Sequence, residues 1–289
     1  MSAGWGAAEI SVAFGAVQAL DRVSAGAWPG QVTAVVGGDG AGKTTLLRCV
    51  AGALAPAAGA VRRPGAARIG YLPPGGGVYD DLSVAENLAF RSAVYRAAGA
   101  TAGEYLERTG LAAAAGRLAG QLSGGMRRKL GVIAAMLPGP ELLILDEPTT
   151  GVDPVSRADL WWLIARAAAG GAAVLMSTTY LDEAARAAHV LVLDAGRALA
   201  AGTPDEIVAS VPGTIAVAPR PPSDEDERRR AWRRAGTWRV WHPGPAAGPA
   251  AGTGATVTPD LQDAVCVAEL RAELARAELA RAGLEAAGA

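Results

Sequence analysis

Short apolar runs, bounded by glycine, proline or polar residues, recur along residues 31–199 of the chain. They are too short for helices and are rich in Val, Ile and Leu, so they predict buried strands. Helical segments alternate with them: residues 44–50 follow the first run, and Ser83 with Glu86 forms a capping box that opens another helix. The pattern favours an α/β fold with a mainly parallel sheet. The predicted strands are 31–36, 69–72, 142–145 and 174–176, followed by a hairpin of 190–193 and 198–199 around residues 194–196.

The pattern changes near residue 212, where a smaller second region is expected. Residues 218–222 (APRPP) read as a linker, and residues 223–234 begin acidic and end basic, which favours a helix capped by Ser223. That charged segment is either a solvated helix or an anion-binding patch. Residues 243–254 are rich in Gly, Ala and Pro and predict a mobile loop. Residues 268–289 predict a docking or fraying helix, because their leucines form too thin a stripe for a coiled coil.

Composition excludes several classes of function. The 289 residues carry a formal net charge of -1, so no overall basic field would collect nucleic acid. The hydrophobic fraction of 51% is inflated by Ala, and no apolar run reaches the length that spans a bilayer. We see no signal peptide at the N-terminus and expect the two cysteines, Cys49 and Cys266, to be small buried thiols in a reducing cytosol.

The first chemical motif is GGDGAGKTT at residues 37–45, which fits G-x-x-x-x-G-K-[ST] between a strand and a helix. Its glycines let backbone N–H groups converge on phosphate oxygens at the start of a helix. Lys43, one of only two lysines in the chain, supplies a compact charge for the β and γ phosphates, and Thr44 can ligate Mg²⁺. The alternative is a glycine-rich turn met by chance. The predicted nucleotide-binding residues here are Gly37, Gly38, Asp39, Gly40, Ala41, Gly42, Lys43, Thr44 and Thr45.

An acidic pair closes the predicted strand at 142–145, in the stretch LLILDEP. Asp146 is placed to hold Mg²⁺ indirectly, through a bound water, and Glu147 can polarise an attacking water. A helix start without chemistry is the alternative. The stretch LSGGM at 122–126 places Ser123, Gly124 and Gly125 at the start of another helix. The backbone N–H groups at this helix N-terminus form a second site that can bind an anion. One chain rarely needs two such sites for one γ-phosphate, whereas two chains that face each other do.

These motifs, in this order and followed by GVDP at 151–154, resemble the ATP-binding subunit of an ABC transporter over about residues 5–210. The resemblance implies a P-loop ATPase domain at 5–210 with a mainly parallel sheet, an N-terminal antiparallel β part and a helical signature subdomain. Residues 211–289 would form a small α+β extension with a flexible loop and a terminal helix. Residues 258–270 also resemble the closing helix of bacterial drug-export and ABC-2-type ATPase subunits.

The resemblance also implies a head-to-tail dimer in which each ATP lies between two chains. Ser123, Gly124 and Gly125 would then bind the γ-phosphate of a nucleotide held by the partner's P-loop, and Asp153 would act across that interface. Phe14 matches the aromatic residue that stacks on adenine, although a core phenylalanine is the alternative. Residues 79–90 resemble the segment that meets a membrane partner.

The chain departs from the family pattern at two positions. A glutamine is usual where Pro74 stands, and a proline has neither an amide side chain nor a backbone N–H. A switch histidine is usual where Tyr180 stands, and a phenol donates one hydrogen bond but brings no positive charge. His189 lies nine residues further along the chain and does not replace it. Hydrolysis could therefore be slow.

The leading hypothesis is an ATP hydrolase that uses ATP and Mg²⁺ and energises an ABC exporter. Glu147, Lys43 and Tyr180 are its catalytic candidates, and Thr44 and Asp146 its metal residues. Its partners would be an integral-membrane permease and a second ATPase chain, identical or similar, at the inner face of the cell membrane in the cytoplasm. The alternative is a degenerate ATP-binding switch that hydrolyses poorly. An ABC-type ATPase that acts on nucleic acid is a third class, disfavoured because the chain has no long coiled-coil insertion and no second ATPase domain.

Overall fold

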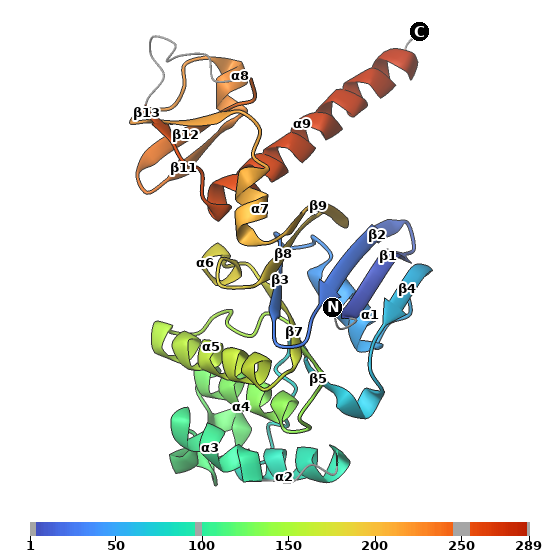
Figure 1. Ribbon diagram of the computed structural model, residues 1–289, viewed down its shortest axis with the longest axis vertical. Coiled ribbons are helices and arrows are strands. Elements are labelled where there is room, and N and C mark those ends of the chain that lie inside the picture. Colours follow the sequence, from blue (N-terminus) through green and yellow to red (C-terminus); the bar gives the residue numbers. More distant parts are fainter. Residues whose placement is uncertain (1–3, 96–99, 245–254, 288–289) are drawn as a thin grey trace. The chain divides into compact units, whose positions relative to one another are not determined.

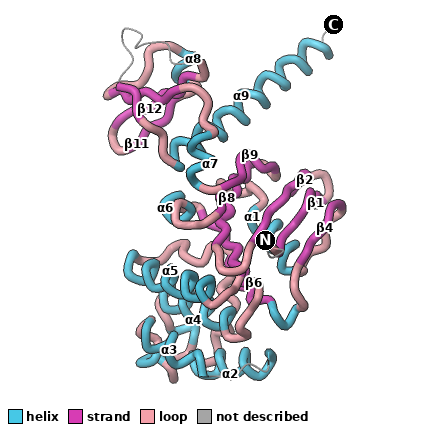
Figure 2. The backbone as a smooth tube through the Cα atoms, in the orientation of Figure 1, coloured by secondary structure: helices cyan, strands magenta, loops and turns pink. Residues whose placement is uncertain are grey.

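The computed structural model describes residues 4–95, 100–244 and 255–287 (Figure 1, Figure 2). The chain divides into two units, Met1–Ala198 and Leu199–Ala289. The boundary falls inside strand β9, whereas the sequence placed it after residue 210. Helix α7, which the sequence assigned to the ATPase domain, packs against helix α9 and groups with the second unit. Among the described residues, no helix has both the length and the apolar character that a membrane span requires.

A six-stranded sheet in the order β5-β6-β7-β3-β8-β9 organises the first unit. Each strand from β5 to β8 runs parallel to its neighbours, as the alternation of strands and helices predicts. The central strands β3, β6 and β7 are buried along their whole length, which explains their continuous apolar sequences. The bounds are β3 Val32–Val36, β5 Ile69–Leu72, β6 Leu142–Leu145, β7 Ala173–Thr178, β8 His189–Asp194 and β9 Arg197–Gly202.

A second, antiparallel sheet in the order β2-β1-β4 is formed by the N-terminal part of the chain (Figure 2). Its inward residues, such as Ile10 and Leu20, share one buried apolar cluster with Leu47 and Val50 of helix α1 and with Leu142 of the parallel sheet. This cluster fixes α1 between the two sheets. The bounds are β1 Trp5–Phe14, β2 Val17–Ala27, β4 Ala58–Arg62 and α1 Lys43–Ala51.

Helices α2 to α5 gather at one end of the first unit, where α4 and α5 pack side by side (Figure 1). The predicted capping box opens α2: the Ser83 N–H donates to Glu86 Oε2 at 2.8 Å, and the Glu86 N–H donates to Ser83 Oγ at 3.2 Å. The bounds are α2 Val84–Tyr95, α3 Ala100–Arg108, α4 Gly124–Met136, α5 Pro154–Ala169 and α6 Leu181–Ala184, with 3-10 turns at Ala66–Arg68, Ala112–Ala114 and Ala119–Gln121.

The second unit contains an antiparallel sheet in the order β11-β12-β10-β13 and the long helix α9. Trp241 and Ile215 of the sheet and Val267 of α9 form its core. The bounds are α7 Pro204–Ala209, β10 Thr214–Ala218, α8 Glu225–Arg228, β11 Ala231–Arg234, β12 Thr237–His242, β13 Ala255–Val257 and α9 Leu261–Ala287.

Two expectations for the second unit need correction. The predicted helix over 223–234 is only one turn, capped by Asp224 and not by Ser223, because residues 231–234 pair with β12 as a strand. The terminal helix begins at Leu261, earlier than 268, and so includes most of the segment 258–270. Most of the predicted mobile loop, residues 245–254, lies outside the described residues. Cys49 is buried as expected, while Cys266 is half-buried.

The predicted fold class is confirmed. A mainly parallel sheet, an N-terminal antiparallel part, a helical subdomain and a small α+β extension are all present. The predicted hairpin is present as β8 and β9, and its turn residues Ala195 and Gly196 have φ angles of 46° and 75°. Positive φ at both positions is the geometry of a tight two-residue hairpin turn.

Candidate active site

The glycine-rich loop lies between the end of β3 at Val36 and the start of α1 at Lys43. Gly42 has a φ of 105°, and a Cβ on it would lie 2.7 Å from the Ala19 carbonyl oxygen. Any larger residue would therefore clash as well as strain the backbone. The loop curls tightly as a result and directs the N-terminus of α1, with its free N–H groups, towards the space in front of it.

That space is a cavity of about 460 Å³, a size typical of small-molecule sites. Its walls are the loop itself and the first residues of β2, and Glu147 and Ala195 complete them. Of the predicted loop residues, Gly37 alone does not line it. The lining residues are Val17, Gln18, Ala19, Gly38, Asp39, Gly40, Ala41, Gly42, Lys43, Thr44, Thr45, Glu147 and Ala195.

Lys43 is held at this cavity by the loop itself. Its ammonium donates to the carbonyl oxygens of Gly37 at 2.8 Å and Gly38 at 3.0 Å, and the side chain is nearly buried. The same nitrogen lies 3.4 Å from Glu147 Oε1. A cation anchored by neutral carbonyls can keep these contacts and still meet a phosphate oxygen, which competes only with the Glu147 carboxylate.

Asp146 follows β6 and is completely buried. Ser177 Oγ, on the neighbouring strand β7, donates to Asp146 Oδ1 at 2.6 Å. The other carboxylate oxygen, Oδ2, is buried without a hydrogen-bond partner among the described residues. An unpartnered buried carboxylate oxygen is costly unless something binds it, and a Mg²⁺-bound water fits this need.

The residues present fit Mg²⁺ in the manner expected of a nucleotide-bound ion. Among the described residues, no group of three His, Cys, Asp or Glu side chains could hold a metal alone. Mg²⁺ in nucleotide sites instead takes one or two protein oxygens, and phosphates and waters supply the rest. Thr44, in the wall of the cavity, and Asp146 would be those protein groups.

Glu147 adopts an unusual backbone conformation. Its φ is 48°, a left-handed value that is uncommon for a residue with a side chain. The surrounding contacts hold it there: its N–H donates to Ser177 Oγ at 2.9 Å, and Thr150 Oγ1 donates to Glu147 Oε2 at 3.2 Å. Strain of this kind concentrates at functional sites. It points the carboxylate towards the P-loop cavity and Lys43.

The LSGGM segment at residues 122–126, called the signature from here on, and the GVDP loop lie against each other. Ser123 caps α4 by accepting from the Met126 N–H at 3.3 Å, and Asp153 caps α5 by accepting from the Ser156 N–H at 2.9 Å. The hydrogen bonding from Ser156 lowers the pKa of Asp153. A Cβ on Gly125 would lie 2.5 Å from Ser156 Oγ, so glycine is required for the two helix starts to approach.

Within the described residues, the signature does not face the P-loop cavity. Gly124 lines a separate hollow of about 170 Å³, together with residues 74–76, Arg127 and Arg128. None of Ser123, Gly124, Gly125 and Asp153 lines the cavity around Lys43. The two predicted phosphate-binding motifs are therefore both formed in one chain but do not share a pocket there.

The loop with Pro74 is held by an arginine that the sequence analysis did not select. β5 pairs with β6, which places residues 73–74 beside the acidic pair. Arg128 Nη1 donates to the Pro74 carbonyl oxygen at 2.9 Å. Burial lowers the pKa of Arg128, while the charges of Glu147 and Asp146 act in the opposite direction. Pro74, which stands where a glutamine is usual, is thus hydrogen-bonded to an arginine that interacts electrostatically with Asp146 and Glu147.

The remaining candidates lie outside the cavity wall. Tyr180 follows β7 and starts helix α6, and β7 pairs with β3 so that Thr178 lies beside Val36, next to the P-loop. Phe14 is 53% exposed and is not a core residue, so that alternative is wrong, while its role against adenine stays a prediction. His189 begins β8, and its ring contacts Trp28 with centroids 4.3 Å apart and planes tilted by 45°, whereas Tyr180 follows the end of β7.

Comparisons with known proteins agree with this geometry. A family model described as ABC transporter matches residues 20–150. The chain is 43% identical over 198 residues to the probable multidrug ABC transporter ATP-binding protein YbhF of Escherichia coli (strain K12). This match covers 64% of the chain and 34% of that protein, so the chain spans about a third of that relative.

A second relative matches over more of its length. The chain is 39% identical over 215 residues to the daunorubicin resistance ATP-binding protein DrrA3 of Streptomyces coeruleorubidus, covering 69% of this chain and 68% of that one. Among solved structures, one described as the ATP-binding subunit of an ABC transporter superposes with a TM-score of 0.66 at 27% identity. The superposition covers 72% of this chain and 92% of that one.

Proposed function

The chain belongs to the family of ABC transporter ATP-binding proteins, and from this premise we propose that it binds and hydrolyses ATP to drive an exporter. The observation that carries the proposal is the P-loop cavity with the acidic pair beside it. Glu147 borders the cavity, and Asp146 offers a buried oxygen without a partner. The P-loop, signature and acidic pair are all complete, so the alternative of a degenerate switch is not favoured.

Each residue has a distinct role in the proposed reaction. The loop N–H groups and Lys43 bind the phosphates, and Thr44 and Asp146 hold Mg²⁺, which would neutralise charge that develops on the phosphate oxygens. Glu147 accepts a hydrogen bond from the attacking water and orients it. Its contact with Lys43 at 3.4 Å is between opposite charges, and a phosphate that engages Lys43 would free the carboxylate for this task.

We infer that the working site is formed by two chains. The signature residues Ser123, Gly124 and Gly125 lie at the start of α4, where N–H groups are free to bind an anion, yet they do not line this chain's own cavity. A second chain that faces the first head to tail would bring its signature to the γ-phosphate. Asp153, packed beside the signature, would lie at the same interface.

The names of the relatives support a proposal for the direction of transport and for the membrane partner. The names of the two relatives above refer to multidrug transport and to daunorubicin resistance, which supports export as the direction. A separate membrane permease would be the partner, and it would place this chain at the inner face of the membrane. Residues 79–90, with the exposed side chains of Tyr79 and Phe90 in edge-to-face contact, are the proposed docking segment.

Steady-state ATP hydrolysis tests the proposal. The purified chain should hydrolyse ATP, and Glu147→Gln should lower kcat by about 100-fold or more while ATP still binds, because only the orientation of the water is lost. Glu225→Gln is a matched control, since Glu225 is an exposed residue of the second unit paired with Arg229. Unchanged hydrolysis in Glu147→Gln would refute the assignment.

A further inference from the structure

Tyr180 is packed against a cation. The guanidinium carbon of Arg157, in the first turns of α5, lies 4.0 Å from the centroid of the Tyr180 ring. Three other arginine–aromatic contacts among the described residues have distances of 5.3 to 5.6 Å. The contact at Tyr180 is therefore the closest of its kind in the described part of the chain, and it joins two segments that the sequence separates by 23 positions.

Arg157 also forms two long ion pairs, but the structure shows no side-chain hydrogen bond from it to another described residue. Its Nε lies 3.7 Å from Glu183 Oε1, and its Nη1 lies 3.8 Å from Asp182 Oδ2, both beyond hydrogen-bond range. Nε is buried and has no hydrogen-bond partner among the residues that the structure describes. The Arg157 side chain is only 29% exposed, so water screens its charge incompletely. The guanidinium charge therefore acts on the Tyr180 ring as well as on these two carboxylates.

Glu183 lies next to Arg157 and is held in place by two hydrogen bonds. It is almost fully buried, and its Oε2 accepts from Thr149 Oγ1 at 2.8 Å and from Thr178 Oγ1 at 2.7 Å. Thr149 follows the acidic pair, and Thr178 ends β7. Thr178 Oγ1 also accepts from the Tyr180 N–H at 3.0 Å. The backbone of Tyr180 is therefore fixed to the same framework that carries Asp146 and Glu147.

Arg157 also connects Tyr180 to the loop at the proposed dimer interface. Its backbone N–H donates to the Asp153 carbonyl oxygen at 2.9 Å, so it lies one helical turn after Asp153. A displacement of the GVDP loop on contact with a second chain would move the start of α5, and Arg157 with it. The Tyr180 hydroxyl makes no hydrogen bond to another described residue, which leaves it free to bind an incoming phosphate.

We propose that Arg157 is a positioning residue for ATP hydrolysis, which holds the Tyr180 ring so that its hydroxyl meets the γ-phosphate. A cation over the face of a tyrosine ring both orients the ring and adds positive potential at it. The pair supplies the hydrogen-bond donor and the positive charge that a switch histidine would provide together. This inference rests on the proposed function, because it assigns a role within the same hydrolytic site.

A double-mutant cycle tests the proposal. Arg157→Ala should lower kcat about tenfold with little change in the ATP dissociation constant or in the melting temperature. Arg157→Lys, which keeps the charge, should recover most of that loss. In a Tyr180→Leu background, which removes the ring, Arg157→Ala should cause no further loss, because Arg157 acts through that ring. Arg186→Ala is the matched control, since Arg186 lies over Trp161 and not over Tyr180.

Several results would overturn the proposal. An equal loss from Arg157→Ala with and without the Tyr180 ring would mean that Arg157 supports the fold or Glu183 and not Tyr180. A loss that appears entirely as weaker ATP binding, or one that Arg186→Ala reproduces, would also contradict it.

A second readout separates this proposal from the proposed function. The chain has five tyrosines, so a tyrosine-labelled sample in the Glu147→Gln background resolves the Tyr180 NMR signal, which Tyr180→Phe assigns. ATP with Mg²⁺ should shift that signal, and Arg157→Ala should abolish the shift. If the shift persists in Arg157→Ala, the proposal fails even where hydrolysis is intact. If the unmodified chain hydrolyses no ATP, the proposed function fails on its own.

Discussion

At the scale of single residues, Gly125 shows what a motif means once its surroundings are known. The sequence selected it as an anion-binding glycine, and the structure adds a packing reason. A Cβ would lie 2.5 Å from Ser156 Oγ and 2.9 Å from Ser156 Cβ, whereas a Cβ on Gly124 would meet no atom within 4 Å. Two adjacent glycines of one motif thus face different constraints within a single chain.

These constraints predict different stabilities for two alanine variants. Gly125→Ala should destabilise the folded chain by about 1 to 3 kcal/mol, because the start of α5 must move away. Gly124→Ala should change stability by no more than about 0.5 kcal/mol, since its Cβ enters open space. Urea unfolding of both variants measures the difference. Equal destabilisation would mean that the α4–α5 contact is looser than the structure indicates.

The residues that sequence alone could assign are those whose chemistry is encoded locally. Lys43, Asp146 and Glu147 follow from short motifs beside apolar strands. The structure places Lys43 and Glu147 in the wall of one cavity and buries Asp146 directly before Glu147. The arginines at the two departures from the family pattern could not be found in this way. Arg128 reaches Pro74 and Arg157 reaches Tyr180 through tertiary contacts, which no local spacing specifies.

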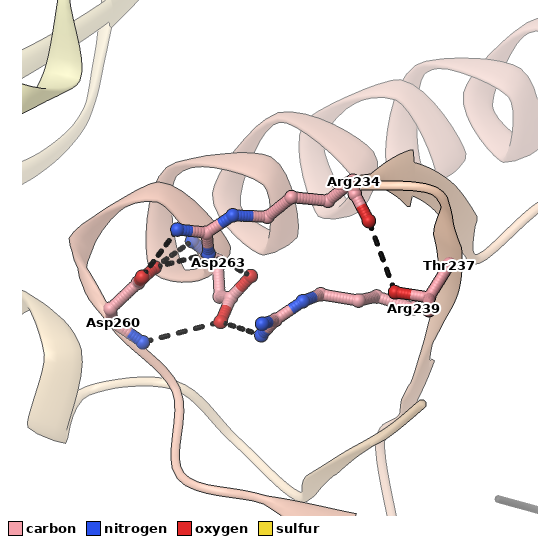
Figure 3. A network of polar contacts seen from close by, with 5 residues as sticks. All are labelled: Arg234, Thr237, Arg239, Asp260 and Asp263. Atoms are coloured by element: carbon pink, nitrogen blue, oxygen red, sulfur yellow. Dashed lines mark hydrogen bonds and ion pairs between the residues drawn. The ribbon is translucent and has the colours of Figure 1, made fainter. Parts of the chain in front are cut away.

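At the scale of elements, tertiary contacts in the second unit also decide structure that the local sequence does not predict. Residues 223–234 have the charge order of a helix, yet their last four residues form β11, because pairing with β12 outweighs a weak helical preference. Ion pairs that join β11 and β12 to the start of α9 stabilise the strand conformation of these residues (Figure 3). Arg234 donates to both oxygens of Asp260, at 2.8 and 2.6 Å, and to Asp263 at 3.0 Å, while Arg239 pairs with the fully buried Asp263.

The same network caps α9. The Asp263 N–H donates to Asp260 Oδ1 at 3.0 Å, and the Asp260 N–H donates to Asp263 Oδ2 at 3.3 Å, a reciprocal arrangement like a capping box. Figure 3 shows the two arginines reaching these carboxylates from the strands. The start of α9 is therefore set by the ion pairs as well as by helix propensity, which explains why propensity alone placed it too late.

The network predicts a dependence of stability on pH. The hydrogen bond from Arg234 lowers the pKa of Asp260, so the folded state binds the proton less tightly than the unfolded state. The resulting stabilisation is complete above the unfolded pKa of about 3.9 and is lost as the pH falls through the lower folded value. Because the Asp260 side chain is half exposed, solvent screening limits the effect to about 0.5 to 1 kcal/mol.

Urea unfolding of Asp260→Asn beside the unmodified chain measures this effect. Asparagine keeps the helix cap, so the comparison isolates the charge. The difference in unfolding free energy should be present at pH 7 and should shrink as the pH is lowered from about 4. A difference that stays constant down to pH 3 would show that the ion pair with Arg234 does not contribute.

At the scale of the whole molecule, the main feature is that the two phosphate-binding motifs of the chain do not share a pocket. The P-loop lines the cavity with Glu147, and the signature lines another hollow with Pro74 and Arg128. Sequence reasoning anticipated this separation only through the family resemblance, because no spacing along the chain reveals which surfaces face a second copy. The account therefore depends on a site shared by two chains.

Subunit complementation tests this shared site most directly. Lys43→Ala disables the P-loop and Ser123→Arg disables the signature, so each variant alone should hydrolyse no ATP. In an equal mixture, half of the pairs would combine one intact P-loop with one intact signature. With one working site in each such pair, hydrolysis should return to about a quarter of the unmodified rate. A mixture that stays inactive, or a Ser123→Arg chain that hydrolyses ATP alone, would contradict the account.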